Sequence, residues 1–279
     1  RQIFPTLHRM AARFTALTIF QNRDDQAFFE RHRMIGKGAN MLIPGSGVDI
    51  EAFDNALLTS PSSNVLRQQL KLDESEVVIT VTRMTRQKGI PTLLAAAALV
   101  NKVRPSVRFL LVGPREGEGS SAVTQAEIDH HAPYVIHVGK RSDIPALLSL
   151  ADVFAFPTEY REGVPRVLLE AGLANLPIVT TKMPGCTDVV RDGWSGFLVP
   201  PRDPNLLAAR ILDMLREREA ARAMGARAGQ LVRKEFGLQL TTDRYAEAYA
   251  ALMDRSAGRS SHGARDGTRQ EISLQEAPS

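Results

Sequence analysis

The sequence predicts an α/β protein built on a doubly wound parallel sheet. Between Val77 and Pro200, short runs of β-branched residues alternate with helical segments. The runs are apolar without polar alternation, which is typical of strands buried on both faces of a parallel sheet. About six such strands make a complete doubly wound domain of roughly 150 residues. A chain of 279 residues can contain such a domain and part of another.

The predicted strands are short and bounded by turn residues. They cover residues 77–82, 107–113, 134–139, 152–157, 177–181 and 196–200. Helices are expected between them at 91–103, near 124–131, at 144–151, after Pro165 and near 187–191. We expect Pro165 at the first helical position, where a missing N–H has no intrahelical partner to lose.

After Asp203 the chain is predicted to be wholly helical, at 204–216, 217–235 and 240–254. The tail 255–279 is polar and lacks aromatic residues, so we expect it to be disordered.

The first 50 residues are expected to lie outside this sheet. They predict one strand and one helix within 14–32, followed by a Gly-rich linker, "LIPGSGVDIEAF". One strand and one helix cannot bury a core alone. We therefore interpret 1–50 as the end of another domain with its linker, 51–237 as the sheet domain and 238–254 as a crossing helix that packs on the other domain. Because the chain opens with Arg1, we expect that processing or truncation removed its start.

Composition restricts the function classes. The single cysteine excludes an internal disulfide and favours a cytoplasmic protein. The net charge of +4 has part of its excess in the first segment, which would favour peripheral contact with an anionic membrane at its inner face. These cations have no interleaved aromatic platform, so we expect no nucleic-acid partner. The longest apolar run, 90–100, is too short to span a bilayer.

Two stretches could hold an anionic ligand, because open α/β sheets bind ligands beyond the carboxyl ends of their strands. In "TRMTRQKG" (82–89), Arg83 and Lys88 could hold a pyrophosphate together with helix amides. A solvated basic turn is the alternative, and spacing alone favours it.

The second stretch is "EYREGVPRVLLEAGLANLPIVTT" (159–181), with Glu162 before a helix N-terminus and Glu170 inside that helix. Gly163 would let a ligand approach the backbone, and carboxylates accept hydrogen bonds from vicinal hydroxyls. The two acids could hold the opposite ends of one ligand, with its anionic middle at the helix N-terminus. A capped amphipathic helix with two solvated acids accounts for the spacing equally well.

Other chemistries have little support. Cys186 has no evident base nearby in sequence, so a nucleophilic role is disfavoured. There is no phosphate-binding P-loop, nucleophile elbow, Asp-x-Asp pair or His/Cys cluster. We therefore expect metal-independent chemistry without a cofactor.

Several ordered motifs resemble one family. The stretches "GSGVD", "TRMTRQKG", "FLLVGP", "FPTEYREGVPRVLLEA", "PIVTT" and "PGCTDVVRDGWSGFLVPPRD" are similar to those of the family-4, group 1 glycosyltransferases of the GT-B fold, in the bacterial surface-polysaccharide branch. The resemblance implies transfer of a sugar, with retention and without metal, from a nucleotide donor such as a UDP-N-acetylhexosamine to a glycan or lipid-linked acceptor.

The resemblance also implies residue roles. Arg83 and Lys88 match the pyrophosphate-binding pair, and Glu162 matches the acid that contacts the donor sugar. The amides of segment 163–165 (Gly163, Val164 and Pro165) would lie along the sugar and phosphate, and Glu170 would bind the ribose. Arg83, Lys88 and Glu162 are the residues expected to act in catalysis.

The N-terminal acceptor domain of this family is represented only by its last strand and helix, so we expect this chain to be the donor-binding half and inactive alone. A nucleotide-sugar epimerase of the same architecture and a non-catalytic nucleotide-sugar-binding module are the alternatives.

Overall fold

The structure is a computed structural model that describes residues 3–36, 38–72 and 74–266, with only the backbone described for 255–266. Its main feature is a six-stranded parallel sheet, which confirms the predicted fold class. The strands are β3 (Glu76–Val81), β4 (Val107–Val112), β5 (Val135–His137), β6 (Val153–Phe156), β7 (Ile178–Thr181) and β8 (Gly196–Val199).

The order of the strands in the sheet is β5-β4-β3-β6-β7-β8. The chain therefore builds outward from β3 in one direction and then, starting with β6, in the other. β3 pairs with β6 through Val78–Val153 and Ile79–Phe154. This reversal between β3 and β6 is a topological switch point, where doubly wound sheets bind their ligands.

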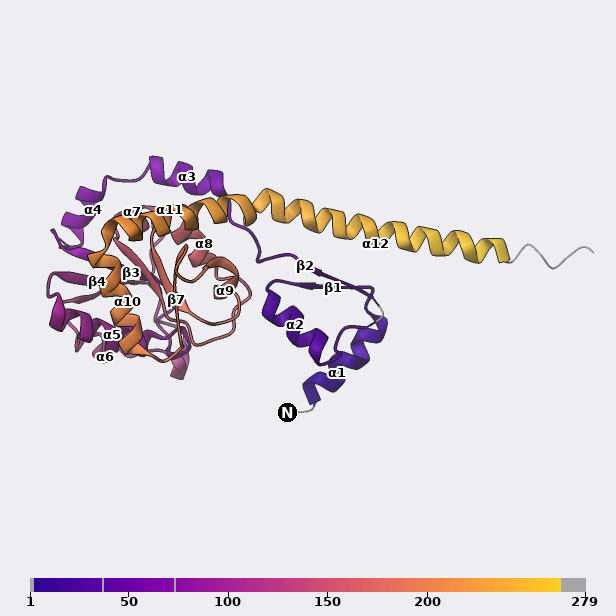
Figure 1. The fold of residues 1–279 in the computed structure, drawn as a ribbon, viewed down its shortest axis with the longest axis horizontal. Helices are drawn as coiled ribbons and strands as arrows, with labels where there is room; N and C mark the ends of the chain where they lie inside the picture. The colour runs from indigo at the N-terminus through magenta and orange to yellow at the C-terminus, as the bar shows by residue number, and fades with distance from the viewer. Residues whose placement is uncertain (1–2, 37, 73, 267–279) are drawn as a thin grey trace, which may run out of the picture.

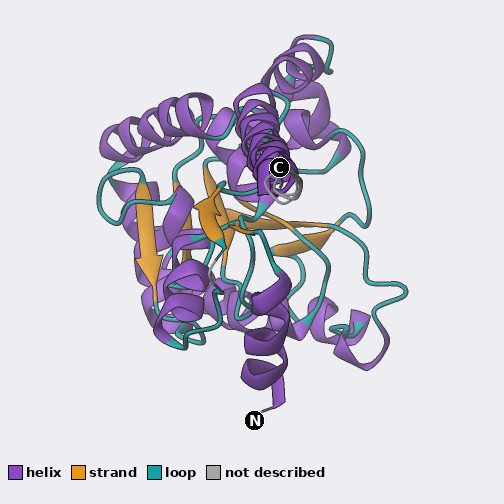
Figure 2. Cartoon of the chain, turned by 90° about the vertical axis from the view of Figure 1, so that its right-hand side faces the viewer, coloured by secondary structure: helices purple, strands orange, loops and turns teal. Residues whose placement is uncertain are grey.

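Helices cover both faces of this sheet (Figure 2). Among the described residues, the helices on one face are α3 (Ile50–Leu58), α4 (Ser63–Gln69), α7 (Ile144–Ser149), α8 (Arg166–Leu173), α9 (Cys186–Val189) and α11 (Arg218–Glu235). The helices on the other face are α5 (Ile90–Val103), α6 (Gln125–Asp129) and α10 (Pro204–Arg216). Neighbouring strand residues divide between the two cores: Val77 and Ile79 are buried in the first and Val78 in the second. The apolar strand runs follow from this burial on both sides.

Two local predictions at helix ends were wrong. Pro165 is the N-cap of α8, with ψ 115°, and Arg166 is its first residue. The last helix, α12, runs from Leu238 to Asp266 and continues through the first part of the segment expected to be disordered from Arg255. The remainder of that segment, 267–279, lies outside the described residues.

The N-terminal region contains more structure than predicted. A two-stranded parallel sheet pairs β1 (Leu17–Phe20) with β2 (Ala39–Leu42). It is accompanied by α1 (Ile3–Ala11), a 3-10 turn at Ala12–Phe14 and α2 (Arg23–Arg31). Of these, the sequence predicted one strand and one helix. The expected linker is also shorter, because β2 extends to Leu42 and α3 begins at Ile50.

This N-terminal unit (residues 3–43) contacts the sheet domain close to the loop after β6. Asn22 is fully buried, caps α2 by accepting from Asp25 N (2.7 Å), and donates to the Glu162 carbonyl at 3.1 Å. At the other end of the chain, α12 leaves the sheet domain and extends past the two-stranded sheet (Figure 1). In the described part of the chain, no helix combines the length and apolar character that crossing a membrane requires.

Candidate functional site

Two loops meet at the switch point of the six-stranded sheet. The loop after β3 contains Arg83 and Lys88, and the loop after β6 contains Glu162. Gly89 allows their close approach: its φ is +72°, and a Cβ there would lie 1.9 Å from the Pro157 carbonyl oxygen. Only glycine fits such a position without displacing the backbone. We take the place where these two loops meet as the candidate site and call it the crevice, because doubly wound sheets bind ligands in a crevice at this point.

Lys88 and Glu162 form an ion pair between the two loops, from Nζ to Oε1. Their side chains are only 13% and 16% exposed, so water screens the pair incompletely. Thr158, which is fully buried, donates its hydroxyl to the same carboxylate oxygen at 3.3 Å. The structure therefore brings together a cation and an acid that lie 74 residues apart in the chain.

The backbone beside Glu162 is also closely packed. A Cβ on Gly185 would lie 2.0 Å from the Gly163 carbonyl oxygen, and a Cβ on Gly45 would lie 2.9 Å from Val164 Cβ. Of the three residues predicted to lie along a ligand, Gly163 and Val164 have an N–H to donate, whereas Pro165 has none. Pro165 could therefore line a ligand only through its ring and its carbonyl group.

Arg83 has a different partner from Lys88. Its guanidinium pairs with Glu118 in the loop after β4, from Nη1 to Oε2 at 2.8 Å. The Arg83 side chain is 57% exposed and that of Glu118 is 15% exposed. Arg83 thus stands at the carboxyl end of the sheet, as predicted, but in the described contacts it meets an acid that the sequence did not single out.

Glu170 projects from α8, and its carboxylate accepts from Arg166 Nε at 3.1 Å. Burial raises the pKa of Glu170, an effect that the charge of Arg166 only partly offsets. A buried acid with a raised pKa is typical of functional sites as well as of structural pairs. No contact in the described residues links Glu170 directly to Lys88 or Glu162.

Glu159 is a residue of this site that sequence reasoning missed. Its side chain is 13% exposed and accepts from Thr92 Oγ1 at 2.8 Å and from Arg202 Nε at 2.6 Å. Its backbone N–H donates to the Gln87 carbonyl at 2.9 Å, next to Lys88. Glu159 therefore links the loops after β3, β6 and β8 at the carboxyl end of the sheet. The only available signal was its place in the motif that contains Glu162.

Cys186 cannot act as a nucleophile in this fold. Its side chain is fully buried, and burial raises the pKa of its thiol to about 12. The thiolate that nucleophilic chemistry requires would be almost absent at neutral pH. The structure supports the sequence argument against this role.

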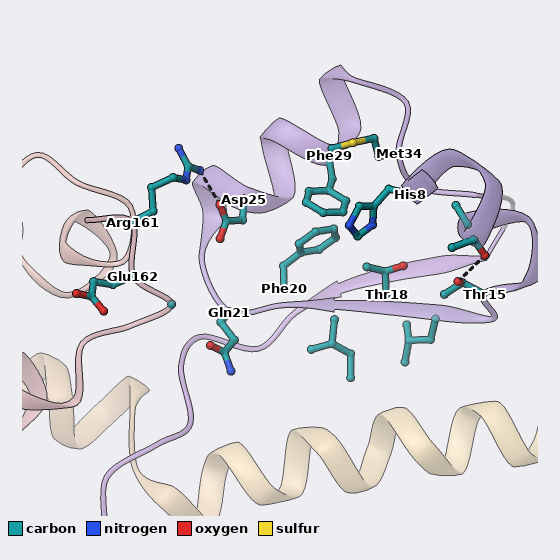
Figure 3. A pocket seen from close by; sticks show the side chains of 15 residues that line it. His8, Thr15, Thr18, Phe20, Gln21, Asp25, Phe29, Met34, Arg161 and Glu162 are labelled. Atoms are coloured by element: carbon teal, nitrogen blue, oxygen red, sulfur yellow. Dashed lines mark hydrogen bonds and ion pairs between the residues drawn. The ribbon is translucent and has the colours of Figure 1, made fainter. Parts of the chain in front are cut away.

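An open pocket of about 720 Å³ lies between the N-terminal unit and the loop after β6. On one side of it the rings of His8 and Phe20 each pack against the ring of Phe29, with centroids 5.1 and 5.2 Å from it (Figure 3). On the other side Arg161 pairs with Asp25 at 2.6 Å. Arg161 is the one arginine or lysine among the described residues that line this pocket, and much of its wall is apolar. It therefore suits a diphosphate less well than the switch point, where the loop after β3 provides both Arg83 and Lys88.

Metal binding has no support within the described ranges, where no group of three or more His, Cys, Asp or Glu side chains is placed to hold an ion. The chemistry that the crevice itself offers is electrostatic: cations beside a carboxylate, with backbone N–H groups nearby.

Comparison with solved structures identifies proteins of similar fold. The crystal structure of Anabaena Alr3699/HepE in complex with UDP-glucose matches with a TM-score of 0.76 and 27% identity, over 90% of this chain and 69% of that one. Sucrose-phosphate synthase from Thermosynechococcus elongatus matches with a TM-score of 0.76 and 25% identity, over 91% of this chain and 63% of that one.

Curated relatives share moderate identity. The N,N'-diacetylbacillosaminyl-diphospho-undecaprenol alpha-1,3-N-acetylgalactosaminyltransferase of Campylobacter jejuni is 25% identical over 91% of this chain and 64% of its own length. The capsular polysaccharide biosynthesis glycosyltransferase CapM of Staphylococcus aureus is 26% identical over 67% of this chain and 49% of its own length. This chain therefore spans less than two thirds of either relative.

The model of the family described as glycosyl transferases group 1 matches residues 62–231, which include both loops of the crevice and most of the sheet domain. The chain belongs to the group 1 glycosyltransferase family.

Proposed function

We propose that residues 51–237 bind the nucleotide-sugar donor of a glycosyl-transfer reaction, and that the crevice at the switch point is the donor site. The observation that carries this proposal is the meeting of Lys88 and Glu162 between the two loops where a doubly wound sheet binds its ligand. Membership of the group 1 glycosyltransferases supports the reaction class.

The proposed roles follow the charges of the crevice. Arg83 and Lys88 hold the diphosphate, and the N–H groups of Gly163 and Val164 lie along it. Glu162 accepts hydrogen bonds from hydroxyls of the donor sugar, for which it must turn away from Lys88. Glu170, about one turn into α8, accepts from the ribose hydroxyls.

Catalysis in this proposal is electrostatic and needs no metal ion. When the bond from the sugar to the diphosphate breaks, negative charge develops on the leaving nucleotide, and the positive charges of Arg83 and Lys88 stabilise it. The anomeric carbon becomes oxocarbenium-like, and the carboxylate of Glu162 lies on the sugar side of the site. We propose that an acceptor hydroxyl oxygen bonds to the anomeric carbon with the configuration of the donor retained, while its proton passes to the leaving diphosphate oxygen.

UDP is the nucleotide that we propose, because Anabaena HepE was solved with UDP-glucose. The name of the Campylobacter relative supports an N-acetylhexosamine as donor sugar and a lipid-linked glycan as acceptor. Peripheral membrane contact on the cytoplasmic side would suit such an acceptor. The exposed apolar residues Ile3, Phe4 and Leu7 of α1 are the surface to test for it with anionic vesicles.

Calorimetric titration of the chain with UDP, GDP and ADP tests the donor site. We expect the chain to bind UDP. Lys88→Gln should weaken this binding more than tenfold, because a charge-assisted hydrogen bond contributes about 1.5 to 3 kcal/mol. Absence of binding to every nucleotide, or equal binding by Lys88→Gln, would rule out this site.

Product analysis after incubation with UDP-sugars separates the alternatives. Free UDP and sugar of unchanged configuration indicate a transferase, and an epimerised UDP-sugar indicates an epimerase. Binding without turnover is expected of a non-catalytic module, and also of a chain that provides only the donor site.

A further inference from the structure

The three cations of the loop after β3 are each held by an acid from a different segment. Lys88 pairs with Glu162, as described above. Arg86 pairs with Glu127 at 2.7 Å, and Arg83 pairs with Glu118 at 2.8 Å. A diphosphate that approaches this loop therefore meets cations whose charges are already neutralised.

The acids differ in how firmly they are held. Glu127 forms a capping box with Thr124 in addition to its pair with Arg86, and its pKa is lowered to about 2, chiefly by the hydrogen bond from the Thr124 N–H. Displacing it would uncap α6. By contrast, Arg83 is the one partner of the Glu118 carboxylate among the described contacts.

The loop that carries Glu118 is fixed at its ends and continues into a short 3-10 helix, Gly119–Ser121. Met84 N donates to the Pro114 carbonyl at 2.9 Å, and Val123 N donates to the Met84 carbonyl at 2.9 Å. Between these anchors, Gly117 and Gly119 flank Glu118 with φ of +83° and +56°, and a Cβ at either position would meet nothing within 4 Å. The Glu118 carbonyl accepts from the Ser121 N–H at 3.3 Å and from its hydroxyl at 2.6 Å, so the backbone of the tip is held. The carboxylate would therefore leave Arg83 by rotation of the Glu118 side chain, beside which neither glycine places a Cβ.

We propose that the Glu118 carboxylate occupies Arg83 in the ligand-free protein and leaves it when the donor diphosphate binds, so that Glu118 sets the affinity for the donor. This inference rests on the proposed donor site. Glu162 also leaves its cation on binding, but it gains sugar hydroxyls in return. Glu118 has no proposed contact with the donor, so its ion pair with Arg83 acts against binding of the diphosphate.

The test is calorimetric titration with UDP of the full chain and of Glu118→Gln at low ionic strength. The neutral side chain should raise the affinity for UDP about two- to fivefold, the range expected for a partly exposed ion pair. Glu116→Gln is the matched control, because it removes the same charge from the same loop. The Glu116 side chain is 77% exposed and pairs with Arg115 at 3.6 Å instead of with Arg83. The affinity of Glu116→Gln for UDP should equal that of the unsubstituted chain.

Combining Glu118→Gln with Arg83→Gln completes the test. The gain should vanish when Arg83 is absent, because the two residues act as a pair. An unchanged affinity in Glu118→Gln, an equal gain in Glu116→Gln, or a gain that survives without Arg83 would overturn the inference while the donor site stands. If no protein in the series binds UDP, the donor site itself is wrong, and the role of Glu118 is excluded with it.

Discussion

Glu162 and Glu170 carry the same charge but have different surroundings. Glu162 faces Lys88 and Thr158 in the crevice, whereas Glu170 is paired with Arg166 on the side of α8. In the proposed site the first contacts the sugar and the second the ribose, so their loss should affect different ligands.

We expect Glu170→Gln to weaken UDP and UDP-glucose alike by about ten- to a hundredfold, the range of a hydrogen bond to a charged group. Glu162→Gln should weaken only UDP-glucose, because the sugar contact is lost while Lys88 stays available to the diphosphate. Calorimetry with both ligands measures this difference. Equal losses for UDP and UDP-glucose in Glu162→Gln would contradict the assignment.

The raised pKa of Glu170 makes a prediction about pH. Burial raises this pKa above its ordinary value of 4.5, so the folded protein holds the Glu170 proton more tightly than the unfolded chain does. The favourable contribution of Glu170 to folding is complete below pH 4.5 and is lost as the pH rises through the raised pKa. Glu170→Gln should therefore raise the melting temperature at pH 7.5 more than at pH 4.5, as measured by thermal unfolding. A larger stabilisation at pH 4.5 would show that the sign is wrong.

At the scale of elements, glycines decide how closely the two crevice loops approach. Gly89 has φ +72° and lies against the Pro157 carbonyl, whereas Gly193 has φ +71° and open space around it. Gly193→Ala should cost only the backbone strain, about 1 to 2 kcal/mol. Gly89→Ala adds a backbone clash and should cost several kcal/mol more in the free energy of unfolding, measured with urea. Similar losses in the two variants would show that the loops can separate easily.

The sequence predicted all six strands of the main sheet, because continuous β-branched runs bounded by turn residues are typical of buried parallel strands. It missed α3, since the glycines before it suggested a linker. The signal was present in Asp49, whose side chain caps this helix by accepting from Ala52 N at 2.9 Å. It also missed β2, a four-residue strand whose only partner among the described strands is β1. A strand of four residues that pairs with a single neighbour is too short to show a clear hydrophobic pattern in the sequence.

Sequence reasoning identified some residues of the candidate site but missed Glu159 and all of the pairings. Lys88 and Glu162 were identified from separate motifs, and only the strand order places their loops next to each other. Glu118 lies in a Gly-rich loop with no periodicity, so nothing in the sequence connects it to Arg83. Contacts between distant loops depend on topology, which local patterns do not encode.

At the scale of the whole molecule, Asn22 joins the N-terminal unit to the candidate site. Asn22→Asp keeps the oxygen that caps α2 but replaces the amide donor to Glu162 O by a second acceptor. We expect the N-terminal unit to be cleaved faster in limited proteolysis, while the sheet domain keeps its melting temperature. Asn40→Asp is the matched control, since Asn40 is exposed in the same unit and its side chain accepts from Gln26 Nε2 at 2.7 Å. Equal cleavage of the two variants would mean that Asn22 does not hold the units together.

The most direct test of the donor site is a crystal structure of the chain with UDP-glucose. We predict the diphosphate between Arg83 and Lys88, the ribose hydroxyls on Glu170, and the glucose hydroxyls on a Glu162 that has turned away from Lys88. A ligand bound elsewhere, for example in the pocket beside His8, with the Lys88–Glu162 pair intact, would contradict the account.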